Sequence, residues 1–180
     1  MLTSSCNAFL DRVASGQPVP GGGGASALCG ALGAALGSMV CHLTLGKKKY
    51  ADVQQDIERL LQQAESLRAQ LQDLVQQDAV AFEPLSQAYG LPKSTPEELA
   101  HREEVMARCL RDACQVPLDI MEVCTQVIAM LEELAQKGSR IALSDVGVGA
   151  AFCHGALEGA SLNVYINTRL MKDRALAQQM

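Results

Sequence analysis

The chain has 180 residues and a formal net charge of -5, and 48% of its residues are hydrophobic while 19% are charged. This length fits one domain, here residues 1–180, with a substantial core. The net negative charge argues against a protein that binds duplex nucleic acid, because such a protein needs a clustered basic face. An aromatic content of only 3% argues against a protein that stacks its side chains on single strands or glycans. We therefore expect no nucleic-acid partner and a core of small aliphatic residues, which is typical of close-packed helices.

The cysteine and histidine patterns predict no metal site. Seven cysteines are present, an odd number, and no two have the CxxC spacing of zinc ribbons or thioredoxin-like motifs. The three histidines are scattered and form no HExxH motif. The N-terminus also lacks a basic segment followed by an apolar one, as in a signal peptide. We expect reduced thiols in a cytoplasmic protein.

The first part of the chain predicts a short helix, a loop and a long buried helix. The short amphipathic segment ends near Gly16, and the four glycines 21–24 predict a loop. Residues 25–45 contain no charged residue and are long enough to cross a bilayer. Their many small and polar residues favour a core helix over a membrane helix, and the same holds for residues 146–168. Glycines inside 25–45 predict close packing against another helix, from this chain or a second subunit: Gly30, Gly33 and Gly37.

The rest of the chain predicts further helices. After Gly46, a plausible helix C-cap, apolar spacing predicts a helix over 52–82. The run 95–98, Thr-Pro-Glu-Glu, predicts the start of a second helix, which Pro117 should kink or restart. Its continuation over 118–136 should end at Gly138, and the last long helix should start at Ser144 or Asp145. No segment alternates with period two, so the predicted fold is an all-α, single-domain bundle of long helices.

Asp78 lies where the pattern of the 52–82 helix requires an apolar residue. The helix's buried stripe reaches this acid one turn after Val75. A buried carboxylate is costly unless it is paired or hydrogen-bonded, and burial raises its pKa toward the range useful for proton transfer. Pro84 also leaves the Val80 carbonyl without its helical donor nearby. The alternative interpretation is a salt bridge to a neighbouring helix.

Three further polar residues occur near or within the last helix. Asp145 follows a serine ahead of an apolar run, and an ordinary N-cap is the simplest interpretation of that pair. Asn163 and Asn167 are four residues apart and therefore share one helical face. Their amides suit either recognition of a flat heterocycle or a bridge to another helix.

Two candidate anion sites flank the 25–45 helix. Gly22 and Gly23 adjoin its N-terminus, where backbone amides can bind an anion, although the run lacks both the P-loop and the dinucleotide motifs. Lys47, Lys48 and Lys49 follow its other end, about 30 Å away. These lysines would complement the helix C-terminus, hold the far end of a long ligand, or meet the glycines across a dimer.

Taken in chain order, these segments resemble the cyclodeaminase/cyclohydrolase family over nearly the whole chain. The matching motifs are Val19-Pro20-Gly21-Gly22-Gly23, residues 30–36, residues 46–50, residues 78–82, residues 91–95 with Glu97 and Glu98, residues 116–118, Ser144-Asp145 and residues 163–167. The resemblance implies an all-helical homodimer, formed through the Gly- and Ala-rich helices, that acts on tetrahydrofolate without another cofactor or a membrane. The implied reaction is that of a methenyltetrahydrofolate cyclohydrolase or a formiminotetrahydrofolate cyclodeaminase.

The resemblance also implies roles for the candidate residues. Asp78 matches the family aspartate implicated in cyclodeamination, so Asp78 and Asp145 are the catalytic candidates. Asp145, Asn163 and Asn167 would contact the pterin. Lys47, Lys48 and Lys49 would contact the folate glutamate tail, within one subunit or across two, and Gly22 and Gly23 are further candidates for binding the substrate. Gly24 stands where the family commonly has serine, and the chain stops at Met180, where relatives usually continue with more helix. These departures leave open a non-catalytic helical relative that binds folate or a protein, and a generic helical scaffold.

Overall fold

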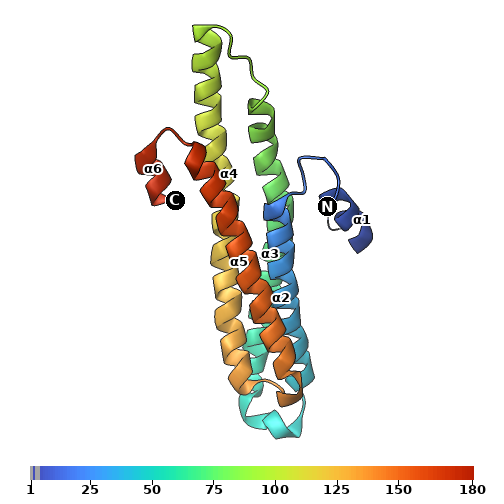
Figure 1. Ribbon diagram of the computed structural model, residues 1–180. Coiled ribbons are helices and arrows are strands. Elements are labelled where there is room, and N and C mark those ends of the chain that lie inside the picture. The colour runs from blue at the N-terminus through green and yellow to red at the C-terminus, as the bar shows by residue number, and fades with distance from the viewer. Residues whose placement is uncertain (1, 3–4) are drawn as a thin grey trace.

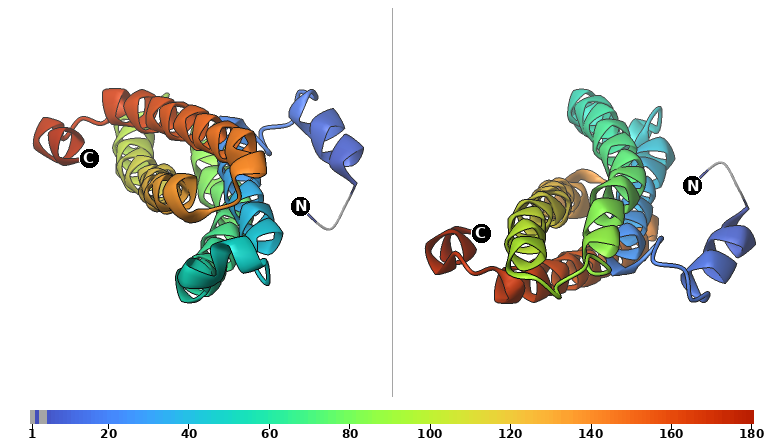
Figure 2. Two further views of the ribbon diagram at one scale, coloured as in Figure 1. Left: turned by 90° about the horizontal axis from the view of Figure 1, so that it is seen from below. Right: turned by 90° about the horizontal axis from the view of Figure 1, so that it is seen from above.

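The computed structural model describes residue 2 and residues 5–180, and all regular structure in this part of the chain is helical. The elements are α1 (Cys6–Val13), α2 (Gly22–Thr44), the 3-10 helix η1 (Lys48–Val53), α3 (Gln54–Ala88), α4 (Pro96–Lys137), the 3-10 helix η2 (Arg140–Ala142), α5 (Leu143–Leu170) and α6 (Arg174–Gln179). Helices α2 to α5 form a bundle, while α1 and α6 lie off it on opposite sides (Figures 1 and 2). The prediction of an all-α bundle is confirmed.

Helices α3 and α4 are longer than their neighbours and form a hairpin that extends beyond the start of α2 and the end of α5 (Figure 1). The four-helix part has a continuous apolar core that includes Leu60, Leu71 and Val127. A second, smaller cluster fills the base of the hairpin, around Leu85 and Leu110. The two ends of the bundle therefore differ, because only the α3–α4 hairpin continues past one of them.

Local signals in the sequence set several helix ends correctly. Thr95 Oγ1 accepts a hydrogen bond from the Glu98 N–H at 3.2 Å, and the Glu98 carboxylate accepts one from the Thr95 N–H at 3.2 Å. This capping box starts α4 as expected. Gly46 follows α2 with φ of 71°, a left-handed conformation that glycine adopts without strain. Gly138 ends α4 as predicted.

Other predicted boundaries are wrong. Gly22 to Gly24 form the first turn of α2 rather than a loop. Helix α4 does not restart at Pro117, which is buried within the continuous helix, so packing on both sides of the proline outweighs the one lost backbone hydrogen bond. The first long amphipathic helix, α3, likewise runs six residues past Phe82, to Ala88. Helix α5 begins at Leu143, directly after η2, and its N-cap, Ala142, makes no side-chain bond, so Asp145 is not an N-cap.

The glycines inside α2 allow close packing within the chain itself. A Cβ on Gly30 would lie 2.8 Å from Cys124 Sγ of α4, and one on Gly33 would lie 2.8 Å from the Gly149 carbonyl of α5. Side chains are absent at these positions because neighbouring helices occupy their space. The predicted intimate packing therefore uses helices of the same chain.

The cysteines are mostly part of the core. All seven are free; five are buried, Cys29 is half-buried and Cys6 is exposed. Burial raises the pKa of the Cys41 thiol to about 11 and also raises the pKa of Cys29. These thiols pack as small apolar side chains, in line with the sequence-based interpretation.

Two helices, α2 and α4, are long and apolar enough to cross a membrane by length and composition alone. In the bundle, 61% of the apolar window of α2 and 50% of that of α4 are buried against other helices. Buried core helices of soluble proteins meet the same criterion, so it is weak evidence for a membrane protein. The absence of a membrane partner stays a prediction.

Candidate active site

Asp78 of α3 faces the N-terminus of α2. The Gly24 N–H donates a hydrogen bond to Asp78 Oδ2 at 2.8 Å, across a large separation in sequence. The first turn of a helix has N–H groups without intrahelical acceptors, and the helix dipole favours a negative charge there. The anion held by this glycine run is therefore a carboxylate of the chain itself. Asp78 lies half-buried between helices, in line with its place in the apolar stripe of α3.

The surroundings of Asp78 alter its acidity. Burial raises the pKa of this carboxyl, and the hydrogen bond from Gly24 offsets part of the rise. A group of this kind exchanges protons nearer to neutral pH than an exposed aspartate does. The alternative of a salt bridge is not what the structure shows, since the partner of Asp78 is a backbone amide.

Gly23 explains why the acid can come so close to α2. A Cβ on Gly23 would overlap the Asp78 carboxylate, whose Cγ would lie only 2.6 Å away. Gly24 has ordinary space at the same place, since its Cβ would lie 3.6 Å from Asp78 Oδ2. Gly23 is therefore required by the close approach, whereas Gly24 contributes its amide.

Asn163 of α5 lies on the other side of the glycine turn from Asp78. A Cβ on Gly22 would lie 3.5 Å from Asn163 Nδ2, and that amide donates to the Gly159 carbonyl at 2.8 Å. The glycine turn thus lies between an amide on one side and a carboxylate on the other. The Ser26 hydroxyl, one turn further along α2, donates to the Gly22 carbonyl at 2.8 Å. A half-buried acid and a neutral amide on the two sides of this turn offer groups for proton transfer and for hydrogen bonding to a polar, planar substrate.

Comparison with known proteins shows the family of the chain. The formiminotransferase-cyclodeaminase family model matches residues 5–180. The chain belongs to the formiminotransferase-cyclodeaminase family. A methenyltetrahydrofolate cyclohydrolase from Methylorubrum extorquens is 46% identical over 171 residues, which are 95% of this chain and 82% of that protein. A solved formiminotetrahydrofolate cyclodeaminase from Thermotoga maritima is 34% identical with a TM-score of 0.85, covering 98% of this chain and 84% of that one.

Some relatives in the formiminotransferase-cyclodeaminase family are much longer. The formimidoyltransferase-cyclodeaminase from Rattus norvegicus is 39% identical over 173 residues, which are 96% of this chain but only 32% of that protein. The chain thus spans about a third of the length of these relatives. Its likeness to them concerns the part of the longer protein that this chain matches.

The other candidate site residues, Asp145 and the three lysines, lie far from Asp78 in the structure. Asp145 lies in the first turn of α5, about 27 Å from Asn163 at a rise of about 1.5 Å per residue. Lys47, Lys48 and Lys49 lie exposed beyond the C-terminal end of α2, the end opposite Gly24 (Figure 1). Within one chain, Asp145 and the three lysines therefore do not contribute to the Asp78 site.

Asn167 has a structural contact. Its side-chain amide is buried and donates to the Ala113 carbonyl of α4 at 3.3 Å. This bond is the bridge to a neighbouring helix that was one of the two interpretations of the asparagine pair. Asn163 and Asn167 share a helical face, but only Asn163 lies against the glycine turn.

Gly24 is a site residue that no sequence pattern indicated, because its backbone amide rather than a side chain makes the contact. A usable signal was the combination of a glycine run at a helix start with an acid out of register on another helix. Among the described residues, no group of three or more His, Cys, Asp or Glu side chains could hold a metal ion.

Proposed function

We propose that this chain is a folate enzyme that opens or closes the one-carbon bridge between N5 and N10 of tetrahydrofolate, with Asp78 as the proton-transfer group. The observation that carries the proposal is the half-buried Asp78 carboxyl with a raised pKa at the N-terminus of α2. The family membership and the names of the relatives support the substrate class.

The reaction passes through a tetrahedral carbon between the two nitrogens. In ring opening, the Asp78 carboxylate accepts a proton from the water that attacks the methenyl carbon. The protonated Asp78 then donates to N5, which leaves, and the hydroxyl of the tetrahedral carbon releases its proton to solvent as the formyl C=O forms. A carboxylate also favours the positive charge of the methenyl bridge electrostatically. Asn163 supplies donor and acceptor groups for the pterin. Water and Asp78 provide every proton transfer, so the proposal needs no cofactor beyond the tetrahydrofolate substrate.

Methenyltetrahydrofolate cyclohydrolase is the first candidate activity. It is supported by the 46% identity to the Methylorubrum extorquens enzyme, which the chain matches over 82% of its length. Formiminotetrahydrofolate cyclodeaminase is the second candidate, supported by the TM-score of 0.85 to the Thermotoga maritima protein. Both use the same tetrahedral carbon, and the deaminase differs in that N10 is the attacking group and ammonia leaves.

The deciding experiment follows the absorbance of 5,10-methenyltetrahydrofolate with the purified protein. We expect its loss to be faster than in the blank, which identifies a cyclohydrolase. A parallel reaction with 5-formiminotetrahydrofolate is followed for ammonia, and the appearance of methenyl absorbance there identifies a cyclodeaminase. A folded protein that is silent in both assays would contradict the proposal and favour the non-catalytic, folate- or protein-binding relative, which the Gly24 departure supports.

We also propose that the protein is a homodimer. Helices α2 and α5 carry exposed apolar side chains on the outside of the bundle, including Leu32 (49% exposed), Met39 (38%) and Phe152 (37%). Burying such a face against a second copy removes apolar area from water. Sedimentation analysis should give the mass of a dimer, and Leu32→Glu with Met39→Glu should give a monomer. Leu99→Glu, an exposed control on α4, should leave the mass unchanged.

The proposed location is the cytoplasm. All seven cysteines are free thiols, which is the state that a reducing compartment maintains. Fractionation of cells that express the tagged protein would test this, and recovery in the membrane fraction would contradict it.

A further inference from the structure

A small hollow lies beside the part of α4 that extends past the end of α5. Its volume is about 280 Å³. The side chains that give it its chemical character are Tyr89 of α3, Arg102, Glu103 and Leu110 of α4, and Leu170 and Lys172 at the end of α5. It combines cations with aromatic and aliphatic walls, and it belongs to the same end of the bundle as Asp78.

Arg102 lacks a hydrogen-bond partner in this hollow. Its Nε atom is buried, and it is the only buried side-chain nitrogen or oxygen without a partner among the residues that the structure describes. A buried N–H without an acceptor is unfavourable. The Arg102 side chain as a whole is only half-buried, so an anion can meet the guanidinium at its exposed part. Lys172 pairs with Glu103 beside it, which leaves Arg102 as the cation with free donors.

The hollow lies at a suitable distance from Asp78. Tyr89 follows Asp78 by eleven residues, about 16 Å at about 1.5 Å per residue, with the buried Leu85 of the second core cluster between them. A ligand that reaches both residues therefore runs along the outside of the bundle and not through this core. An extended folate spans a distance of this order between its pteridine ring and its glutamate. On α5, the same direction leads from Asn163 to Leu170, which lines the hollow.

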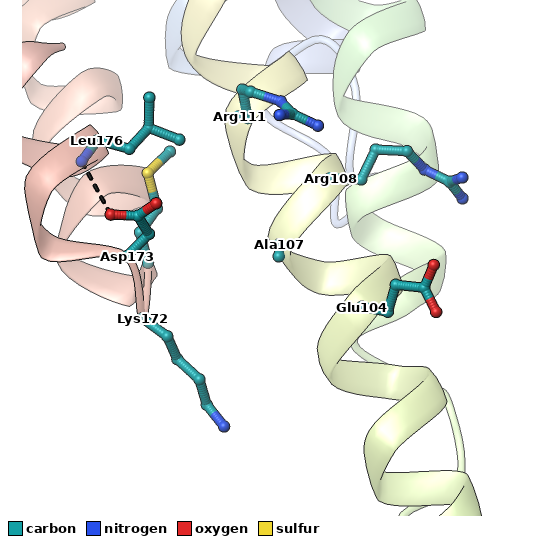
Figure 3. Close-up of a pocket in the computed structure, with 8 residues that line it drawn as sticks. Glu104, Ala107, Arg108, Arg111, Lys172, Asp173 and Leu176 are labelled. Carbon is teal, nitrogen blue, oxygen red and sulfur yellow. Dashed lines mark hydrogen bonds between the residues drawn. The ribbon is translucent and has the colours of Figure 1, made fainter.

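Two other cationic groups fit this position less well. The lysines 47–49 lie at the opposite end of α2. A neighbouring hollow of about 370 Å³ lies between α4 and α6, and Figure 3 shows the side chains of Arg108 and Arg111 extending away from α6 there. Arg102 therefore fits this position best, because it lies at the same end of the bundle as Asp78 and has an N–H without an acceptor.

We propose that Arg102, assisted by Lys172, binds a glutamate carboxylate of the folate whose one-carbon unit lies at Asp78. This inference rests on the proposed function and assigns the tail of the substrate to α4 instead of to the lysines. A guanidinium presents parallel N–H donors that match the two oxygens of a carboxylate. Tyr89 and Leu170 provide an amphipathic wall for the neighbouring aromatic amide.

The test compares 5,10-methenyltetrahydrofolate with 5,10-methenyltetrahydropteroate, which lacks the glutamate. For the wild-type protein, removal of the glutamate should raise KM roughly 10- to 100-fold, the range of one charge-assisted hydrogen-bond pair. Arg102→Met should raise KM for the folate by a similar factor and should no longer distinguish the two substrates. Arg102→Lys should restore part of the difference, because it keeps the charge without the paired donors.

Matched controls locate the effect. Arg108→Met changes the same residue type on another face of α4, and a triple Lys47→Gln, Lys48→Gln, Lys49→Gln variant neutralises the lysines. Both should keep the full wild-type preference for the glutamate. Loss of that preference in either control, with Arg102→Met still discriminating, would overturn the inference. Equal thermal unfolding temperatures would establish that Arg102→Met is folded.

A binding measurement separates this inference from the proposed activity. Calorimetric titration compares 5-formyltetrahydrofolate with 5-formyltetrahydropteroate, which need no turnover. Tighter binding of the folate that depends on Arg102 would support the inference. Absence of turnover of either substrate by the same wild-type protein would contradict only the catalytic proposal. Equal affinity of the wild-type protein for both compounds, or no binding of either, would overturn the inference.

Discussion

Helix α3 carries two aspartates whose surroundings push their pKa values in opposite directions. Near its start, Asp56 accepts a hydrogen bond from Lys137 Nζ at 2.6 Å, and this contact lowers the pKa of Asp56. Further along the same helix, burial raises the pKa of Asp78, whose partner is the neutral Gly24 N–H. The two acids are alike in sequence, yet one is paired with a cation and the other is not.

The difference shows how a structural carboxylate is distinguished from a functional one. Asp56 has an oppositely charged partner on another helix, so its charge is compensated and holds α3 to α4. Asp78 is less exposed and lacks such compensation, so it changes protonation more readily. Groups kept in this state are enriched at sites of chemistry.

The largest expected effect concerns activity. Asp78→Asn keeps the acceptor for the Gly24 N–H but cannot transfer a proton, so turnover should fall about 10²- to 10⁴-fold. Asp56→Asn, the matched change on the same helix, should keep wild-type turnover per folded molecule. Initial rates on methenyltetrahydrofolate, measured beside thermal unfolding, check both variants. An Asp78→Asn protein with full turnover would remove the distinction between the two acids.

A second test changes the backbone that Asp78 approaches. Gly23→Ala would place a Cβ inside the Asp78 carboxylate, so we expect a loss of about 1–3 kcal/mol in the free energy of unfolding, as for other overpacked sites. Gly24→Ala has room, and there the reduced entropy of the unfolded chain should leave stability equal or about 0.4–1 kcal/mol higher. Urea unfolding of the two variants measures the difference. An equal loss of unfolding free energy in both variants would mean that the close approach of Asp78 to Gly23 does not exclude a side chain there.

The smallest expected effect is a pH dependence of opposite sign. The pKa of Asp56 is lowered on folding, so its contribution to stability is present above the unfolded pKa, about 3.9, and is lost as pH falls through the folded pKa. The pKa of Asp78 is raised, so the native state binds this proton more tightly. Its contribution is present below the unfolded pKa and is lost as pH rises through the folded one.

Thermal unfolding of the two Asn variants across pH measures these contributions. Relative to the wild-type protein, Asp78→Asn should gain stability as pH is raised from about 4 toward 7. Asp56→Asn should instead lose its relative stability as pH is raised from about 2 to 4. If the stability of both variants relative to the wild-type protein changed in the same direction with pH, the two aspartates would not have opposite pKa shifts.

Residues with local signals could be predicted from the sequence. The capping box at Thr95 and the helix ends at Gly46 and Gly138 depend on neighbouring residues, so their patterns were sufficient. Asp78 was also found, because it breaks a regular apolar stripe. Each of these features is visible within a few turns of chain.

Features that depend on distant contacts could not be predicted in the same way. The run of glycines at 22–24 predicts a loop locally, but the Asp78 carboxylate from α3 satisfies the first turn and a helix forms. Asp145 follows the pattern of an N-cap, yet η2 moves the helix start ahead of it. Arg102 is one of many charged residues on an amphipathic helix, and only the folded chain shows that its Nε is buried without a partner.

The distribution of thiols makes the folded protein selective toward alkylating reagents. The thiolate is the reactive form of cysteine, and six of the seven thiols are wholly or partly enclosed by the bundle. Cys6 is exposed on α1, which lies to one side of the bundle (Figure 2). A maleimide dye added to the native protein should therefore attach at Cys6, so a single fluorophore can report on α1 without any change to the sequence.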